Sequence, residues 1–185
     1  MSPLGIVQSM RSVRAIAATA VVGLLVTTLA SAAAAKPKGI NECKLLTDAQ
    51  AEAIMGVEPY GKPTPDNGGC SWQTDPYDRE NIAYVTLKVE KAAPVLADYD
   101  GDLRTYLDES TNVGIDELAD VGDEAFTTYS PLSGPGTADG VSVLVGKQLV
   151  QLGIRPVETV ENPSPELDDL VGIVKKVVAK VQRAS

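Results

Sequence analysis

The stretch GGCSWQT, residues 68–74, places one of the two cysteines two positions from the only tryptophan in this chain of 185 residues. Side chains two positions apart on a β-strand point to the same side of it. If residues 69–74 form a strand, Cys70 and Trp72 therefore face the same way. We expect Trp72 to pack in the core beside a disulfide formed by Cys70.

Cys43 is the only possible partner for Cys70 within the chain. An even cysteine count in an exported protein favours a structural bridge. The chain contains no histidine, so neither the usual zinc site nor a thiol activated by a histidine base finds its partners. We predict no metal site and no cofactor, and a Cys43–Cys70 disulfide that stabilises the fold by roughly 3 kcal/mol.

The first 35 residues are typical of a secretory signal peptide. Arg11 and Arg14 precede an apolar run at about 15–30, and small residues follow it. Cleavage is expected after Ala32 or after Ala35. The alternative is a leader retained as an anchor, although a run of about 16 apolar residues is slightly shorter than the roughly 20 that span a bilayer.

Cleavage would divide the chain into a signal peptide (1–35), a linker (36–42) and a single domain (43–185). Without the two leader arginines, 14 basic and 25 acidic residues remain, a formal net charge of −11. Such an acidic domain has no basic footprint for nucleic acid or anionic lipid. We predict a secreted or extracytoplasmic protein of the cell envelope, with no stable membrane span after cleavage.

Local patterns predict the secondary structure. Thr47 and Gln50 form a capping-box pair and Gly56 is a natural stop, which predicts a helix at 48–55. The segment 81–91 alternates apolar and polar residues, as does a strand with one wet face. Further strands are expected at 69–74, 124–130, 140–146 and 148–155, and further helices at 98–110 and from Ser164–Pro165 to the C-terminal region.

The order of these elements predicts an α+β fold. We expect a mostly antiparallel sheet of about five strands, with helices packed on one face and one disulfide. The segment 57–69, rich in proline and glycine, is expected to be a loop.

Two groups of carboxylates are candidates for a site. The spacing of Asp98, Asp100, Asp102 and Glu109 resembles a calcium loop, but Leu103 stands where that loop requires glycine, so we favour acids that begin a helix. The second group could supply an acid and a base, although surface charge is the simpler reading of it. Its members are Asp116, Glu117, Asp123 and Glu124.

Aromatic residues are sparse, which leaves little for a platform that stacks nucleic-acid bases. Tyr60, Trp72 and Tyr77 lie in or beside the predicted loops, and we consider them as the lining of a small apolar ligand pocket. Simple core packing is the competing interpretation. A histidine-based hydrolytic triad is excluded, and no glycine-rich phosphate loop is present.

Three segments together resemble a family of small exported actinobacterial domains of unknown function, many of them lipid-anchored. The segments are CKLLTDAQAEAIMG (43–56), GGCSW (68–72) and VGDEAF (121–126), and the resemblance covers roughly residues 41–181. It implies a disulfide between Cys43 and Cys70 and transfers no catalytic residue. This chain lacks the lipidated cysteine of many such proteins.

We therefore expect an exported, non-catalytic envelope domain that binds a small ligand or a protein partner. The alternative is a carboxylate-dependent hydrolase acting on envelope glycans. A cleft with two facing carboxylates would favour the enzyme, and an apolar pocket or exposed apolar patch would favour binding.

Overall fold

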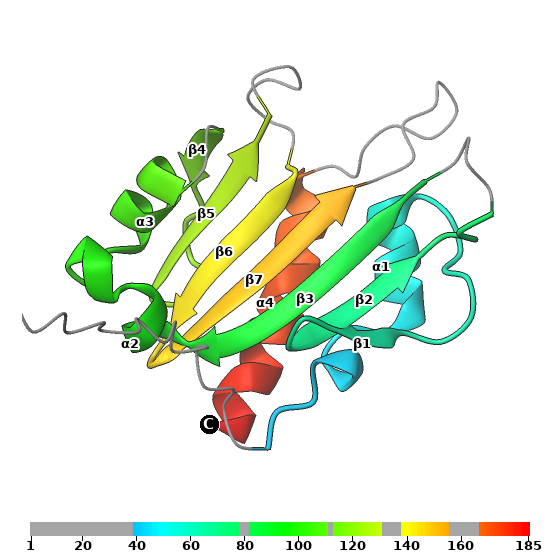
Figure 1. Cartoon of the computed structure of the whole chain (residues 1–185), viewed down its shortest axis with the longest axis horizontal. Helices are drawn as coiled ribbons and strands as arrows, with labels where there is room; N and C mark the ends of the chain where they lie inside the picture. The colour runs from blue at the N-terminus through cyan, green and yellow to red at the C-terminus, as the bar shows by residue number, and fades with distance from the viewer. Residues whose placement is uncertain (1–38, 78–81, 111–112, 131–137, 156–166) are drawn as a thin grey trace, which may run out of the picture. The chain divides into compact units, whose positions relative to one another are not determined.

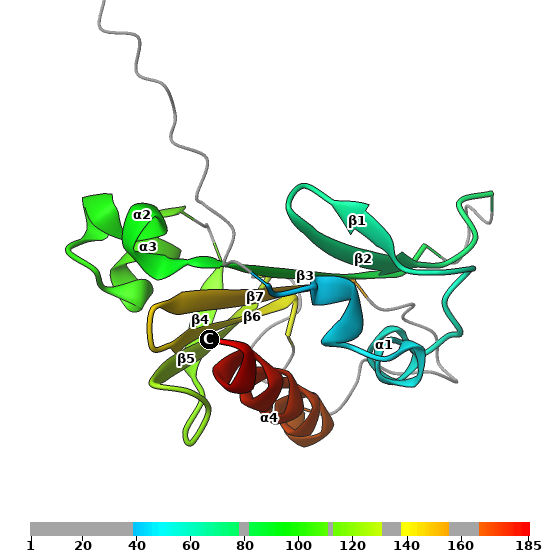
Figure 2. The ribbon, with the colours of Figure 1, turned by 90° about the horizontal axis from the view of Figure 1, so that it is seen from below.

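A computed structural model describes residues 39–77, 82–110, 113–130, 138–155 and 167–185, which build a single antiparallel sheet with helices on both faces (Figures 1 and 2). The strand order is β1-β2-β3-β7-β6-β5-β4. The strands are β1 (Thr64–Asp66), β2 (Gly69–Gln73), β3 (Tyr84–Lys91), β4 (Gly114–Glu117), β5 (Glu124–Tyr129), β6 (Gly140–Val145) and β7 (Gln148–Arg155). The helices are α1 (Asp48–Met55), α2 (Ala92–Val95), α3 (Leu103–Ser110) and α4 (Leu167–Ala184), with 3-10 turns η1 (Glu42–Lys44) and η2 (Ala97–Tyr99).

The predicted α+β class and antiparallel sheet are confirmed, but the prediction of about five strands is wrong because the sheet has seven. The two additional strands, β1 and β4, are its edges. All three residues of β1 are exposed, and no residue of β4 is buried. Short edge strands of this kind carry no alternation of buried and exposed residues, so periodicity cannot reveal them.

The larger core lies between the sheet and the pair α1 and α4 (Figure 2). The predicted apolar face at 83–89 is confirmed, since Ala83, Val85, Leu87 and Val89 are each at most 1 % exposed. The opposite face is not wet along its whole length, because Glu90 is buried. From α4 comes the apolar stripe that the 3.6-residue spacing predicts. Its buried members are Leu170, Ile173, Val174, Val177, Val178 and Val181.

A second, smaller core lies on the opposite face of the sheet, beneath α2 and α3. Leu103 and Leu107 of α3 pack there with Phe126 of β5 and Leu149 of β7. The expectation that helices cover one face only is therefore wrong. Successive residues of β5 point into opposite cores: Ala125 belongs to the larger core and Phe126 to the smaller one.

The segment around Cys70 ties the N-terminal part of the domain to the sheet. The predicted disulfide is confirmed: Cys43 in η1 is bonded to Cys70 on β2. Cys70 and Trp72 are both 1 % exposed on the same side of β2, as the strand period requires. The capping box is also confirmed, because the Thr47 side chain accepts from Gln50 N–H and the Gln50 side chain accepts from Thr47 N–H.

Several predictions concern residues outside those described. The signal peptide, its cleavage sites and the Ser164–Pro165 helix start fall in this category. Among the helices in the described ranges, none is long and apolar enough to cross a membrane.

Candidate functional site

The large hydrophobic side chains that stay exposed gather at one end of strands β2 and β3. Among the described residues they are Tyr60, Tyr77, Ile82 and Tyr84, with exposed fractions of 58 %, 87 %, 48 % and 38 %. We call these four residues the aromatic end. Single exposed hydrophobic residues are ordinary, but a group at one place marks a surface that another molecule can cover.

Backbone hydrogen bonds bring these residues together from separate segments. The Tyr60 N–H donates to the carbonyl of Gln73 over 2.8 Å, and Gln73 is paired with Tyr84 across β2 and β3. Beyond the strands, Thr74 N–H donates to the Ala83 carbonyl over 3.0 Å. The loop before β1 is thereby held against the β2–β3 ladder.

The loop after β2 is held by side chains as well. Ala83 N–H donates to Thr74 Oγ1 over 3.1 Å, and Thr74 is buried. Tyr77 N–H donates to Asp75 Oδ1 over 2.9 Å, which folds the chain into a local turn. The exposed Tyr77 side chain therefore projects from a loop whose first residues are held by hydrogen bonds.

A pocket of about 490 Å³ lies beside the aromatic end. We call it the β2–β3 pocket, and its volume is in the range of small-molecule sites. It combines apolar, hydroxyl, amide and carboxylate groups. The lining residues are Asp66, Ser71, Gln73, Thr74, Asp75, Pro76, Ile82, Ala83, Tyr84 and Thr86.

A second pocket, of about 280 Å³, adjoins the first. Ser71, Gln73 and Pro76 line both, so strand β2 forms their common wall. We call it the Tyr60 pocket. Its other lining residues are Pro59, Tyr60, Gly61, Lys62, Pro63, Thr64 and Trp72.

The structure places the three predicted ligand-binding aromatics differently. Tyr60 lines the Tyr60 pocket, whereas Tyr77 is the most exposed of the aromatic end and lines neither pocket. Trp72 reaches the wall of the Tyr60 pocket but is only 1 % exposed, and its Nε1 donates to Asp48 Oδ1 over 3.2 Å. Their role in binding stays a prediction.

Sequence reasoning missed Tyr84 and Ile82, which line the larger pocket. A signal for Tyr84 was present, because it has the opposite parity to the buried apolar residues of β3. That parity predicts only that Tyr84 lies on the more polar face of β3. The absence of a covering helix at this end, among the described residues, is a property of the tertiary structure.

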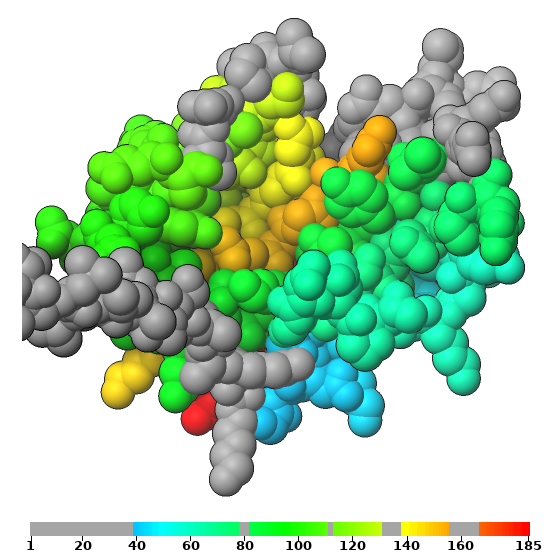
Figure 3. Space-filling view, in the orientation of Figure 1, coloured from blue at the N-terminus to red at the C-terminus, as the bar shows by residue number. Residues whose placement is uncertain are grey.

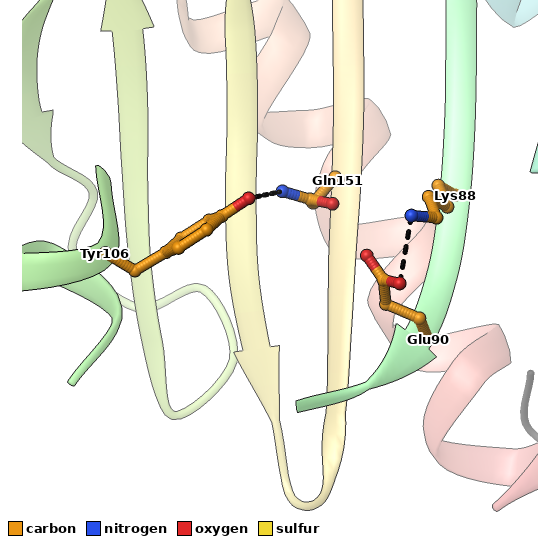
Figure 4. Close-up of polar contacts among 4 residues, drawn as sticks. All are labelled: Lys88, Glu90, Tyr106 and Gln151. Carbon is orange, nitrogen blue, oxygen red and sulfur yellow. Dashed lines mark hydrogen bonds and ion pairs between the residues drawn. The ribbon is translucent and has the colours of Figure 1, made fainter. Parts of the chain in front are cut away.

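Further along the same face of the sheet, side chains from β3, β7 and α3 form a polar cluster (Figure 4). Lys88 Nζ is 2.9 Å from Glu90 Oε2, and the Glu90 side chain is 6 % exposed. On the neighbouring strand, Gln151 Nε2 donates to the hydroxyl of Tyr106 over 3.4 Å. In the space-filling view, this part of the sheet surface lies in a hollow between α3 and the β1–β2 hairpin (Figure 3).

The candidate acid–base residues do not converge on these pockets. Asp116 and Glu117 are successive residues of β4, and Asp123 Oδ2 accepts from Gly146 N–H at the β6–β7 turn. Burial raises the pKa of Glu124, with smaller contributions from the negative charges of Asp102 and Glu117. Glu124 lines neither the β2–β3 pocket nor the Tyr60 pocket.

Of the residues considered for calcium binding, Asp102 has a structural role. Asp102 Oδ1 accepts from Thr105 N–H over 2.6 Å at the start of α3. This backbone hydrogen bond and one to the Thr105 side chain lower the pKa of Asp102. Within the part of the chain that the structure describes, no three His, Cys, Asp or Glu side chains group as metal ligands do.

Comparison with known proteins returns no match to this chain, whether among family models, curated proteins or solved structures.

Proposed function

We propose that this protein is an exported, non-catalytic domain of the cell envelope that binds a ligand at the aromatic end. The observation that carries the proposal is that the exposed side chains of Tyr60, Ile82 and Tyr84 line two adjoining pockets. Covering exposed apolar surface is favourable in proportion to the area removed from water. A concave, mixed apolar and polar lining is typical of small-molecule sites.

Three further features support the placement in the envelope. The Cys43–Cys70 bridge favours an oxidising compartment. The leader pattern at 1–35 and the resemblance to exported domains point the same way.

The proposal is tested by native and denaturing mass spectrometry of the protein purified from its natural host. We expect a heavier native species that releases a small molecule on denaturation. The double variant Tyr60→Ala/Tyr84→Ala should lose this species, because both rings are removed from the pocket walls. The matched variant Tyr60→Phe/Tyr84→Phe keeps the rings and should retain it. Native and denatured masses that agree for the wild-type protein would contradict the proposal.

A carboxylate-dependent glycan hydrolase is the second candidate. The observation in its favour is Glu124, whose raised pKa suits a general acid and whose neighbours include Asp102 and Glu117. Release of soluble fragments from purified cell-wall glycan, abolished by Glu124→Gln, would establish this activity. No release by the wild-type protein would exclude glycan hydrolysis under those conditions.

A further inference from the structure

The described charged residues that line the β2–β3 pocket are all acidic. Among the described residues that line it, Asp66 and Asp75 carry carboxylates and none is a lysine or an arginine. From this pocket, and resting on the proposed binding function, we propose that the ligand is a small organic cation with an apolar body, of the alkylammonium class. Opposite charge favours its head group, and the apolar lining favours its body.

Among the described residues, the basic side chains nearest in sequence or register lie outside the lining. Lys88, the next residue of β3 on this face after Thr86, is paired with Glu90 at 2.9 Å. Arg155 is paired with Tyr84 across β3 and β7, but it does not line the pocket. Lys62 lines the neighbouring Tyr60 pocket only.

The fold places the two acids on either side of the pocket. Asp75 is held at the loop base, where its Oδ1 accepts from Tyr77 N–H. Asp66 lies on the edge strand β1, paired in register with Gly69 of β2. The two carboxylates thus come from opposite ends of β2, and the pocket between them contains Ser71 and Gln73.

The apolar part of the lining suits a cationic ligand as well. Tyr84, Ile82 and Pro76 line the same pocket. A tyrosine ring presents a negative face that attracts ammonium groups at close range. Anions gain nothing from this arrangement, so the site should select among ligands of the same length by charge.

Three probes with one alkyl chain separate charge from apolar contact: hexyltrimethylammonium, hexyl glucoside and hexyl sulfate. Binding to the disulfide-bonded protein is measured by chemical-shift titration of the isotopically labelled chain. We expect hexyltrimethylammonium to bind about fivefold tighter than hexyl glucoside, and hexyl sulfate to bind weakest. The shifts should centre on residues of the β2–β3 pocket.

Asp66→Asn and Asp75→Asn remove charge while keeping shape, and the amide oxygen introduced at position 75 can still accept from Tyr77 N–H. Each should weaken hexyltrimethylammonium about two- to fivefold and leave hexyl glucoside unchanged. Glu52→Gln, which removes an exposed charge from α1 on the opposite face of the sheet, is the matched control and should change neither. Raising the ionic strength from about 0.01 M to about 0.15 M shortens the Debye length from about 30 Å to about 8 Å, so it should weaken the cationic probe selectively.

The outcomes distinguish the two proposals. Equal affinity for the three probes at this pocket overturns the charge preference and leaves the binding function standing. Tighter binding of hexyl sulfate likewise overturns the charge preference alone. If none of the probes shifts any residue of the pocket, the charge preference and small-ligand binding at the aromatic end both fail.

Discussion

Trp72 Nε1 donates a hydrogen bond to Asp48 Oδ1 over 3.2 Å, which joins strand β2 to the first residue of helix α1. The two residues are 24 positions apart, and Trp72 is 1 % exposed. A buried indole N–H requires a partner, because leaving it without one costs the full desolvation penalty. This bond therefore fixes α1 beside the Tyr60 pocket, whose wall Trp72 reaches.

Replacing Asp48 by alanine should destabilise the domain by about 1–3 kcal/mol, because the indole donor loses its acceptor in a buried position. Asp48→Asn retains a carbonyl oxygen at the same place and should cost less. Urea unfolding of both variants, followed by tryptophan fluorescence, measures the difference. Equal losses of unfolding free energy for the two variants would show that the hydrogen bond is not responsible.

Removing the disulfide should destabilise the domain by roughly 3 kcal/mol on the chain-entropy model, since the bridge closes a loop with a sequence separation of 27 residues. The variant Cys43→Ala/Cys70→Ala and the reduced wild-type protein should unfold at similar, lower urea concentrations. A reduced wild-type protein as stable as the oxidised one would contradict this expectation. The double variant separates loss of the bridge from effects of the reductant.

Gly69→Ala should destabilise the sheet, because a Cβ at Gly69 would lie too close to the backbone carbonyl oxygen of Leu87. Relieving that overlap requires β2 and β3 to separate, and overpacking of this kind costs about 1–3 kcal/mol. The measurement is the free energy of unfolding from urea titration. The β2–β3 pocket should also change, since both strands line it.

Gly172→Ala provides the matched comparison for the same substitution. In the described part of the chain, no atom of another element lies within 4 Å of a Cβ built at Gly172, which is inside helix α4. Alanine is favoured over glycine in a helix by about 1 kcal/mol, so this variant should be more stable than the wild type. Destabilisation by both variants would indicate that space at the Cβ does not decide the outcome.

Glu124 gives a pH dependence with a defined sign. Its pKa is raised above the ordinary value of 4.5, chiefly by burial. The folded state then binds more protons than the unfolded state, so this residue's contribution to stability falls as the pH rises from the unfolded pKa through the folded pKa. It is fully present below the unfolded pKa.

Glu124→Gln removes this titration while keeping an acceptor of similar shape. Relative to the wild type, the variant should gain stability as the pH rises through that window. Urea unfolding of both proteins across mildly acidic to neutral pH measures the difference. A difference that is constant with pH would show that the ionisation of Glu124 is not linked to folding.

Much of the central sheet was predictable because its signals are local. The alternation along β3 and the 3.6-residue stripe of α4 each report a buried apolar face. Likewise, the capping box of α1 involves only Thr47 and Gln50, which are three positions apart. Edge strands β1 and β4 have no buried face to report, so no periodic signal marks them.

The candidate site was less predictable. Tyr60 was identified because aromatic residues are rare in the chain, whereas Tyr84 was not, because its strand parity indicates only that it points away from the larger core. Phe126 and Leu149 also point to that second face, yet they are buried beneath α2 and α3. Parity alone does not distinguish the covered part of the face from the open part.

Local sequence specifies the period-two face shared by Cys70 and Trp72, the paired cysteines and the amphipathic C-terminal helix. These properties depend on residues close in the chain or on there being only one possible partner. Packing of the whole chain, in contrast, sets α2 and α3 over one end of the sheet and leaves Tyr84, Ile82 and the pocket between Asp66 and Asp75 exposed. That outcome depends on contacts between distant segments, which local periodicity does not encode.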